Sequence, residues 1–234
     1  MRPKSPKATF DPSPAPQSHR SRPSLPEILA ASLLLLVLLA GGLASAEPAT
    51  DAAPSADRAD LRSALVEHLE RTRGLLDRQT EGLSEAQWNF KPAEDQWSIA
   101  EVTEHLAVVE DLVYGRVSAA LAEETPAEIL GQAGGKADQL LAVVLDRSQK
   151  FQAPERVQPA QRWESTAAML AEFERLRRDN LALARQAALW SHATEHPVVG
   201  PLDVHGWLLF VSGHCERHIA QIAEIKTADG YPEG

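Results

Sequence analysis

The sequence predicts an all-α fold, a four-helix bundle with a long crossover between helices 2 and 3, preceded by an N-terminal signal segment. Apolar residues recur at helical spacing in four long segments. Pro and Gly residues gather between the second and third of these segments, where the crossover is expected. No segment shows the alternation of a strand or the Gly-rich loop of a βαβ unit, so a helical bundle is favoured.

The first 46 of the 234 residues have the pattern of an export segment. A basic, Pro-rich stretch is followed by 19 uncharged residues, 28–46, which end in Ala44-Ser45-Ala46. This pattern predicts a signal peptide that is cleaved before Glu47. The uncharged run is close to the ~20 residues that span a bilayer, so an uncleaved signal anchor is the alternative. Either way, we expect an exported domain, in the periplasm or outside the cell, or one anchored to the membrane with the domain outside the cytoplasm.

Composition limits the partners of the remaining chain. Beyond residue 46 there are 18 basic and 31 acidic residues, a net charge of −13. No nucleic-acid partner is expected, since phosphate binding needs a basic patch. We assign 47–57 to a flexible tether, 58–228 to one domain and 229–234 to a tail. We expect a small-molecule substrate, whose identity the sequence does not reveal. We expect contact with the membrane only through an uncleaved signal segment. The protein could form a homodimer.

The first two long helices are predicted from their apolar stripes. The first runs from about Asp60 to Gln79, and a short helical turn follows at 82–88. The second runs from Ser98 to about Ala122, because Ser98 and Glu101 have the spacing of a capping box. In the crossover we expect a short helix at 137–147 and an extended loop at 153–159.

The other two long helices follow the crossover. Thr166 is expected to cap a third helix over 167–188, with Arg177 among its solvated charges. A loop with exposed His192 and His196 comes next. Asp203 is then a good N-cap for the fourth helix.

Three histidines are the candidate metal ligands. His214 and His218 are four residues apart in the fourth helix, so their imidazoles leave it on one side. A catalytic zinc-type site normally takes three protein ligands and keeps an open position. His105 is the best third donor because it lies on the apolar stripe of the second helix. Taken alone, it would more often be a core histidine than a ligand.

At this point the sequence resembles the DinB-like (DinB/YfiT) superfamily of metal-dependent enzymes. The resemblance covers roughly residues 58–228 and is carried by 97–110, 153–159 and 196–222. It implies that His105, His214 and His218 bind one divalent ion (Zn, Ni, Mn or Fe) at one end of the bundle. It also implies relatives that are thiol-dependent S-transferases and isomerases of the cytosol. An export signal would place this domain where such thiols are scarce.

Two hypotheses follow. The first is an enzyme whose three-histidine metal site activates a water or a thiol, as in hydrolases or S-transferases. Gln221 or Glu104 could then hold the second nitrogen of a ligand, and Glu110 or Glu216 could serve as an acid. The alternative is a non-catalytic bundle that binds a metal or a partner.

Four other residues bear on the choice between these hypotheses or on which residues belong to the site. His68, which borders the stripe of the first helix, could complete the coordination as a fourth ligand. A metal ion with four protein ligands would have no open position for catalysis. Cys215 points about 100° away from His214 and is expected to be a buried thiol rather than a nucleophile. His192 and His205 are expected to take no part in the site.

Overall fold

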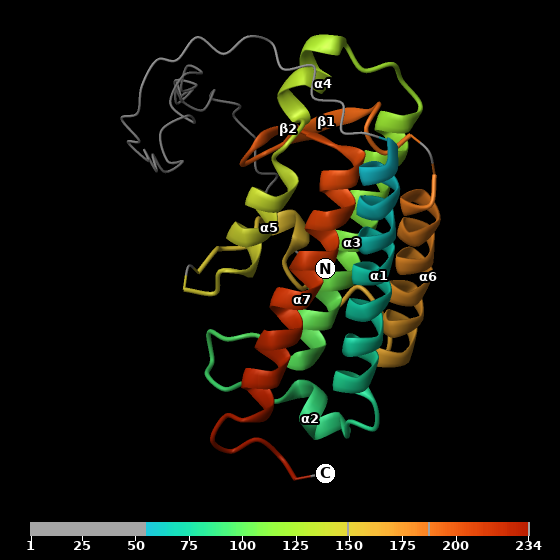
Figure 1. Ribbon diagram of the computed structural model, residues 1–234. Coiled ribbons are helices and arrows are strands. Elements are labelled where there is room, and N and C mark those ends of the chain that lie inside the picture. The colour runs from blue at the N-terminus through green and yellow to red at the C-terminus, as the bar shows by residue number, and fades with distance from the viewer. Residues whose placement is uncertain (1–54, 149, 187, 234) are drawn as a thin grey trace, which may run out of the picture. The chain divides into compact units, whose positions relative to one another are not determined.

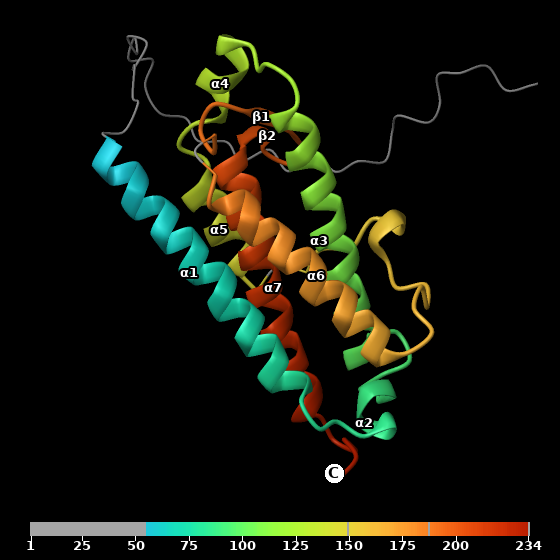
Figure 2. The same cartoon turned by 90° about the vertical axis from the view of Figure 1, so that its right-hand side faces the viewer.

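Four long helices form a bundle in the computed structural model, which describes residues 55–148, 150–186 and 188–233 (Figures 1 and 2). They are α1 (Ser55–Thr80), α3 (Ile99–Leu121), α6 (Thr166–Ala184) and α7 (Val204–Lys226). The predicted signal segment lies outside the described residues, as does the tether up to residue 54. Within the described ranges, no helix is long and apolar enough to cross a membrane.

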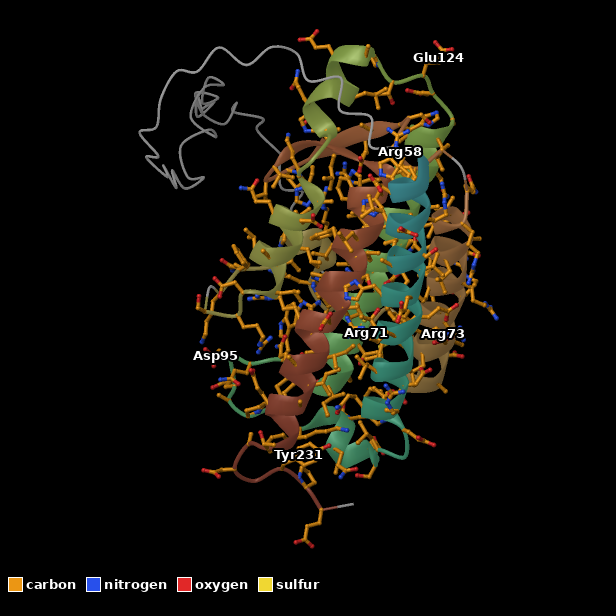
Figure 3. All side chains as sticks on the ribbon, in the orientation of Figure 1. Arg58, Arg71, Arg73, Asp95, Glu124 and Tyr231 are labelled. Atoms are coloured by element: carbon orange, nitrogen blue, oxygen red, sulfur yellow. The ribbon has the colours of Figure 1, made fainter. Side chains whose placement is uncertain are left out.

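The bundle has two helices running in each direction. Arg62 near the start of α1 donates to the carbonyl oxygen of Ala184 at the end of α6. Arg73 lies on the side of α1 that faces α6 (Figure 3). It pairs with Glu174, so α1 and α6 are antiparallel. α7 lies beside α1 and runs in the same direction, while α3 lies between α6 and α7 and runs with α6 (Figures 1 and 2). Because α3 and α6 are parallel, the chain between them must return along the bundle. This is the crossover that the sequence predicted.

The crossover contains α4 (Ala127–Ala133), α5 (Ala137–Leu145) and a 3-10 turn, η1 (Glu155–Val157). The sequence predicted α5 but not α4. α5 packs closely along α7, since a Cβ built on Gly213 would lie 2.3 Å from Cδ1 of Leu141. Arg217 of α7 also donates to the carbonyl oxygens of Val144 and Asp146 at the end of α5. The crossover is thus a packed part of the domain.

One expectation for the connection before α7 was wrong. Instead of a loop, the chain forms an antiparallel hairpin of β1 (Ala193–His196) and β2 (Gly200–Asp203). Two strands of four residues are too short to produce a recognisable alternation. The hairpin buries His196, which is 6 % exposed and packs against Trp207, so the expected exposure of this histidine was also wrong.

Side-chain caps fix the starts of the helices. Ser84 and Gln87 form a capping box at α2 (Glu85–Asn89), and Ser98 and Glu101 form one at α3. Asp203 caps α7 as predicted. Three boundaries differ from the prediction: Ser165 rather than Thr166 caps α6, α6 ends at Ala184, and α1 already begins at Ser55. Residues 55–57, which had been assigned to the tether, are therefore helical.

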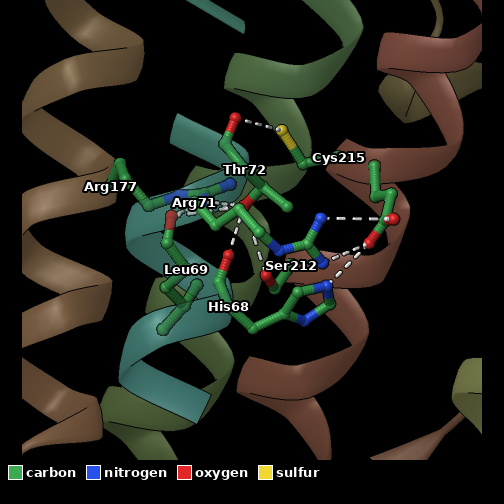
Figure 4. A network of polar contacts seen from close by, with 8 residues as sticks. His68, Leu69, Arg71, Thr72, Arg177, Ser212 and Cys215 are labelled. Atoms are coloured by element: carbon green, nitrogen blue, oxygen red, sulfur yellow. Dashed lines mark hydrogen bonds and ion pairs between the residues drawn. The ribbon is translucent and has the colours of Figure 1, made fainter. Parts of the chain in front are cut away.

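A buried ion pair joins three of the four helices. Arg177 of α6 is fully buried and donates from Nε and Nη2 to Glu110 of α3. It also donates from Nη1 to Leu69 and Thr72 of α1 (Figure 4). Asn180 donates to the other carboxylate oxygen of Glu110. The expectation that Arg177 is solvated was wrong, because the residue continues the buried series Phe173, Leu176, Arg177, Asn180 at helical spacing.

We predict that Ser98→Ala destabilises the domain by about 1 kcal/mol, because the backbone N–H of Glu101 loses its side-chain acceptor. Urea unfolding measures this loss. Ser63→Ala, at an exposed site within α1, is the control and should change stability little. Equal stability of Ser98→Ala and wild type would contradict the role of this cap.

We predict that Glu110→Ala destabilises the domain by about 3–5 kcal/mol, because it leaves the buried guanidinium of Arg177 without a counter-charge. The double variant Glu110→Leu/Arg177→Met removes both charges and should lose much less than the sum of its single variants. Additive losses in this double-mutant cycle would show that the two residues are not energetically coupled.

Candidate metal centre

The three predicted histidines meet between α3 and α7. His214 and His218 project from successive turns of α7, and His105 projects from the antiparallel neighbour α3. The Nε2 atom of His214 lies 3.1 Å from Nε2 of His105 and 3.2 Å from Nε2 of His218. Within the described part of the chain, these residues form the one cluster whose donor atoms could share a metal ion, and we call it the histidine cluster.

In two of these imidazoles, the hydrogen bond made by Nδ1 determines where the lone pair of Nε2 points. Nδ1 of His105 is 2.7 Å from the carbonyl oxygen of Val157, which can only accept, so this nitrogen carries the proton. Nδ1 of His218 likewise donates to Oε1 of Gln221 over 2.7 Å. The lone pair of each Nε2 therefore faces the centre of the cluster. Gln221 has the position that the sequence suggested, whereas the contribution of Val157 was missed.

The third imidazole, His214, is held differently. Its Nδ1 is buried and has no hydrogen-bond partner among the described residues. The ring instead packs near Phe210, with 5.6 Å between ring centroids. The orientation of His214 thus depends on packing, while those of His105 and His218 depend on hydrogen bonds.

The surroundings keep the cluster uncharged at neutral pH. Burial lowers the pKa of His105, and the charge of Arg162 adds to this effect against the hydrogen bond to Val157. Burial and the neighbouring His105 lower the pKa of His218 to about 3. Burial also places the pKa of His214 well below its usual value. Neutral imidazoles are the form that binds metal ions, so a metal ion would not have to displace the proton of an imidazolium.

Trp97 forms one wall of the cluster. Its ring lies 4.9 Å from that of His105 and is stacked on His218 at 6.3 Å between centroids. His105 is buried, with 3 % exposure, whereas His214 and His218 are half-buried. From the sequence, Trp97 was given no role in the site and was used only as the first residue of the segment 97–110 that carries the family resemblance.

Glu104 does not hold a ligand nitrogen, contrary to one of our suggestions. Its carboxylate accepts hydrogen bonds from the backbone N–H groups of Ala160, Gln161 and Arg162 at 2.8, 3.0 and 3.2 Å, and from the Arg162 side chain. Gln161 has a left-handed backbone with φ of 56°, so this turn presents its N–H groups to one anion. Burial alone would raise the pKa of Glu104, but the bonds from Ala160 and Arg162 lower it below its usual range. Glu104 thereby anchors the loop that carries Val157.

The other suggested site residues lie elsewhere. His68 bonds to Glu216 rather than joining the cluster, so neither residue is in a position to serve as fourth ligand or acid there. Glu110 is committed to Arg177. Cys215 is fully buried, and burial raises its pKa to about 11, which agrees with its expected role as an inert thiol.

Comparison with known proteins identifies the family. The family model described as the DinB superfamily matches residues 68–222, which include all three histidines of the cluster. The chain belongs to the DinB superfamily. The uncharacterized protein YuaE of Bacillus subtilis (strain 168) is 29% identical to this DinB-superfamily chain over 150 residues, which are 63% of this chain and 88% of that protein.

A solved structure has a similar fold. YfiT from Bacillus subtilis, described as a probable metal-dependent hydrolase with an unusual four-helix bundle topology, superposes with a TM-score of 0.53 at 19% identity. The match covers 73% of this chain and 89% of YfiT. At this identity the likeness establishes the fold alone. The present bundle, with its parallel α3 and α6, thus resembles a known four-helix bundle.

We predict that Glu104→Gln destabilises the domain by about 2 kcal/mol at pH 7, because the loop amides lose a charged acceptor. The pKa of Glu104 is lowered by folding, so its contribution is fully present above the unfolded value of 4.5, begins to decrease below it, and is lost as the pH falls through the lower folded pKa. Urea unfolding at pH 7 and near pH 4 measures both values. Glu94→Gln, at an exposed site, is the control. A loss of stability that is the same at both pH values would contradict this account.

Proposed function

We propose that this DinB-superfamily protein is a metal-dependent enzyme in which His105, His214 and His218 hold a divalent ion. The observation that carries the proposal is the convergence of three Nε2 atoms, two of which have their lone pairs directed inward by Val157 and Gln221. The neutral state of the three rings supports it further. Imidazole donors suit Zn, Ni and Fe and also bind Mn, so the donor set alone leaves the choice among these ions open.

The composition of the cluster favours a catalytic site over a structural one. A structural zinc site is normally closed by four protein ligands, whereas a catalytic site has three and keeps a position open. His68, the suggested fourth ligand, is bound to Glu216. When bound, a divalent ion would supply Lewis acidity and lower the pKa of a coordinating water or thiol. The chain itself would orient the imidazoles through Val157 and Gln221 and limit solvent access through Trp97.

Hydrolysis is the reaction type that we favour. YfiT, which shares the fold, is described as a probable metal-dependent hydrolase. Export of the domain, which we propose from residues 1–46, would also separate it from the low-molecular-weight thiols of the cytoplasm. A water nucleophile needs no such cosubstrate. A thiol-dependent transferase is therefore the second candidate in the activity screen.

We predict that the wild-type protein binds one divalent ion and that His105→Ala, His214→Ala and His218→Ala each weaken binding more than ~100-fold, beyond the ~10–100-fold loss typical of an outer hydrogen-bond partner. Calorimetric titration with Zn²⁺, Ni²⁺ and Mn²⁺ measures affinity, and a screen of ester, amide and thiol-transfer substrates measures activity. His192→Ala is the matched control and should retain both.

Two outcomes would contradict the proposal. The same three nitrogens could form a metal-free cluster in which Nε2–H of His214 donates to its neighbours, and equal metal content in wild type and variants would favour that arrangement. Metal binding by the three histidines without turnover of any substrate class would favour the alternative, a non-catalytic metal-binding bundle.

We also predict that the mature protein begins at Glu47, because Ala44-Ser45-Ala46 has the small residues of a signal-peptidase site. Mass spectrometry of the N-terminus, combined with cell fractionation, measures this. A full-length chain in the membrane would indicate the signal anchor instead. A full-length chain in the cytosol would contradict both forms of export.

A further inference from the structure

One ligand of the histidine cluster lacks the hydrogen bond that orients the other two. When Nε2 of a neutral imidazole binds a metal ion, the proton of the ring lies on Nδ1. In His105 and His218 this N–H group donates to Val157 and Gln221. Nδ1 of His214 is buried and has no hydrogen-bond partner among the described residues. The direction of the His214 ring is therefore set by the side chains that pack against it.

Phe210, one helical turn before His214 on α7, is one of these side chains. Side chains in an α-helix lean toward its N-terminus, so a ring covers the residue four positions earlier. The ring centroids of Phe210 and His214 are 5.6 Å apart, and the ring planes differ by 36°. The other rings beside His214 in the described part of the chain belong to the ligands His105 and His218. Phe210 is thus the neighbouring ring that is not itself a metal ligand.

The hairpin before α7 holds Phe210 in place. The ring of Phe210 meets that of His196 in β1 edge to face at 5.1 Å between centroids, and that of Trp207 at 6.0 Å. Trp207 is buried and donates from Nε1 to the carbonyl oxygen of Thr194, which also belongs to β1. Aromatic pairs at these separations attract one another beyond the apolar area that they bury. Contacts from both the hairpin and α7 therefore limit the movement of the Phe210 ring.

The place of Phe210 on α7 matches a role at the cluster. Phe210, His214 and His218 follow one another at intervals of four residues and are all half-buried, whereas the three residues between Phe210 and His214 are buried. Phe210 thus lies on the same stripe of α7 as the two ligands. It also packs against the buried core, so an effect on metal binding has to be separated from an effect on stability.

We propose that Phe210 is the positioning residue of the metal ligand His214. The second side-chain torsion of a histidine has broad energy wells, so an imidazole without a hydrogen bond can turn easily. The ring of Phe210 restricts this rotation and keeps Nε2 of His214 directed at the corresponding atoms of His105 and His218, 3.1 and 3.2 Å away. The inference rests on the function proposed for the cluster, because it concerns the same metal ion.

A double-mutant cycle in Zn²⁺ affinity, measured by calorimetry on the purified protein, tests this proposal. We expect Phe210→Ala to weaken Zn²⁺ binding about tenfold, the lower end of the loss typical of an outer partner of a metal ligand. In the His214→Ala background the same change should weaken the remaining binding less than about twofold, because the ligand through which Phe210 acts is gone. Phe210→Tyr keeps the ring and should bind Zn²⁺ as wild type does.

Leu209→Ala is the matched control for stability. Leu209 is buried, lines the cleft between α1 and α5, and lies about 140° around α7 from His214. Its truncation should lower stability in urea unfolding and leave Zn²⁺ affinity unchanged. Should Phe210→Ala fail to fold, Phe210→Leu, which keeps apolar volume without a flat ring, takes its place in the cycle.

Three results would overturn the role of Phe210 while leaving the metal centre in place. Phe210→Ala could bind Zn²⁺ as wild type does, it could weaken binding equally with and without His214, or Phe210→Tyr could lose as much affinity as Phe210→Ala. A wild-type protein that does not bind Zn²⁺, Ni²⁺ or Mn²⁺ would instead overturn the function proposed for the cluster, and this inference with it.

Discussion

The buried ion pair of Arg177 and Glu110 is the constraint on which the geometry of the bundle depends. Two opposite charges in the core must be paired and their remaining hydrogen-bonding groups satisfied, which permits few arrangements of the helices that carry them. Arg177 also binds Leu69 and Thr72, so the pair sets α1, α3 and α6 relative to one another. Glu110 and His105 are five residues apart on α3, about 140° around the helix. With Glu110 turned toward α1 and α6, His105 is turned toward α7.

Local features of α3, α7 and one loop position the three imidazoles of the histidine cluster. α7 supplies two imidazoles through its own periodicity, and the capping box at Ser98 defines the start of the helix that supplies the third. Glu104 binds the turn at 160–162, and the loop before this turn carries the carbonyl oxygen that orients His105. Two adjacent residues of α3 therefore have linked roles: Glu104 holds the loop, and Val157 of that loop orients His105 at the site. Such preorganisation reduces the rearrangement that metal binding would require.

Local patterns in the sequence predicted the long helices, the caps of α3 and α7, the crossover and the three histidines. They did so because spacing on a helix determines direction, as for His214 and His218, and because an imidazole on an apolar stripe, His105, needs a partner. What the sequence missed depends on tertiary contacts. The bond from His105 to Val157 joins residues far apart in the chain, and burial of Arg177 follows from a carboxylate on another helix. The short hairpin before α7 likewise has no periodicity long enough to detect.

The central claim is that three imidazoles from α3 and α7 bind one metal ion. X-ray absorption spectroscopy of the Zn²⁺-loaded protein tests it most directly, because imidazole rings produce a distinct multiple-scattering pattern. The account predicts three imidazole nitrogens at about 2.0–2.1 Å, completed by an oxygen ligand. The number of imidazoles should fall to two in His214→Ala. A spectrum dominated by carboxylate oxygens, or one that is unchanged in His214→Ala, would contradict the account.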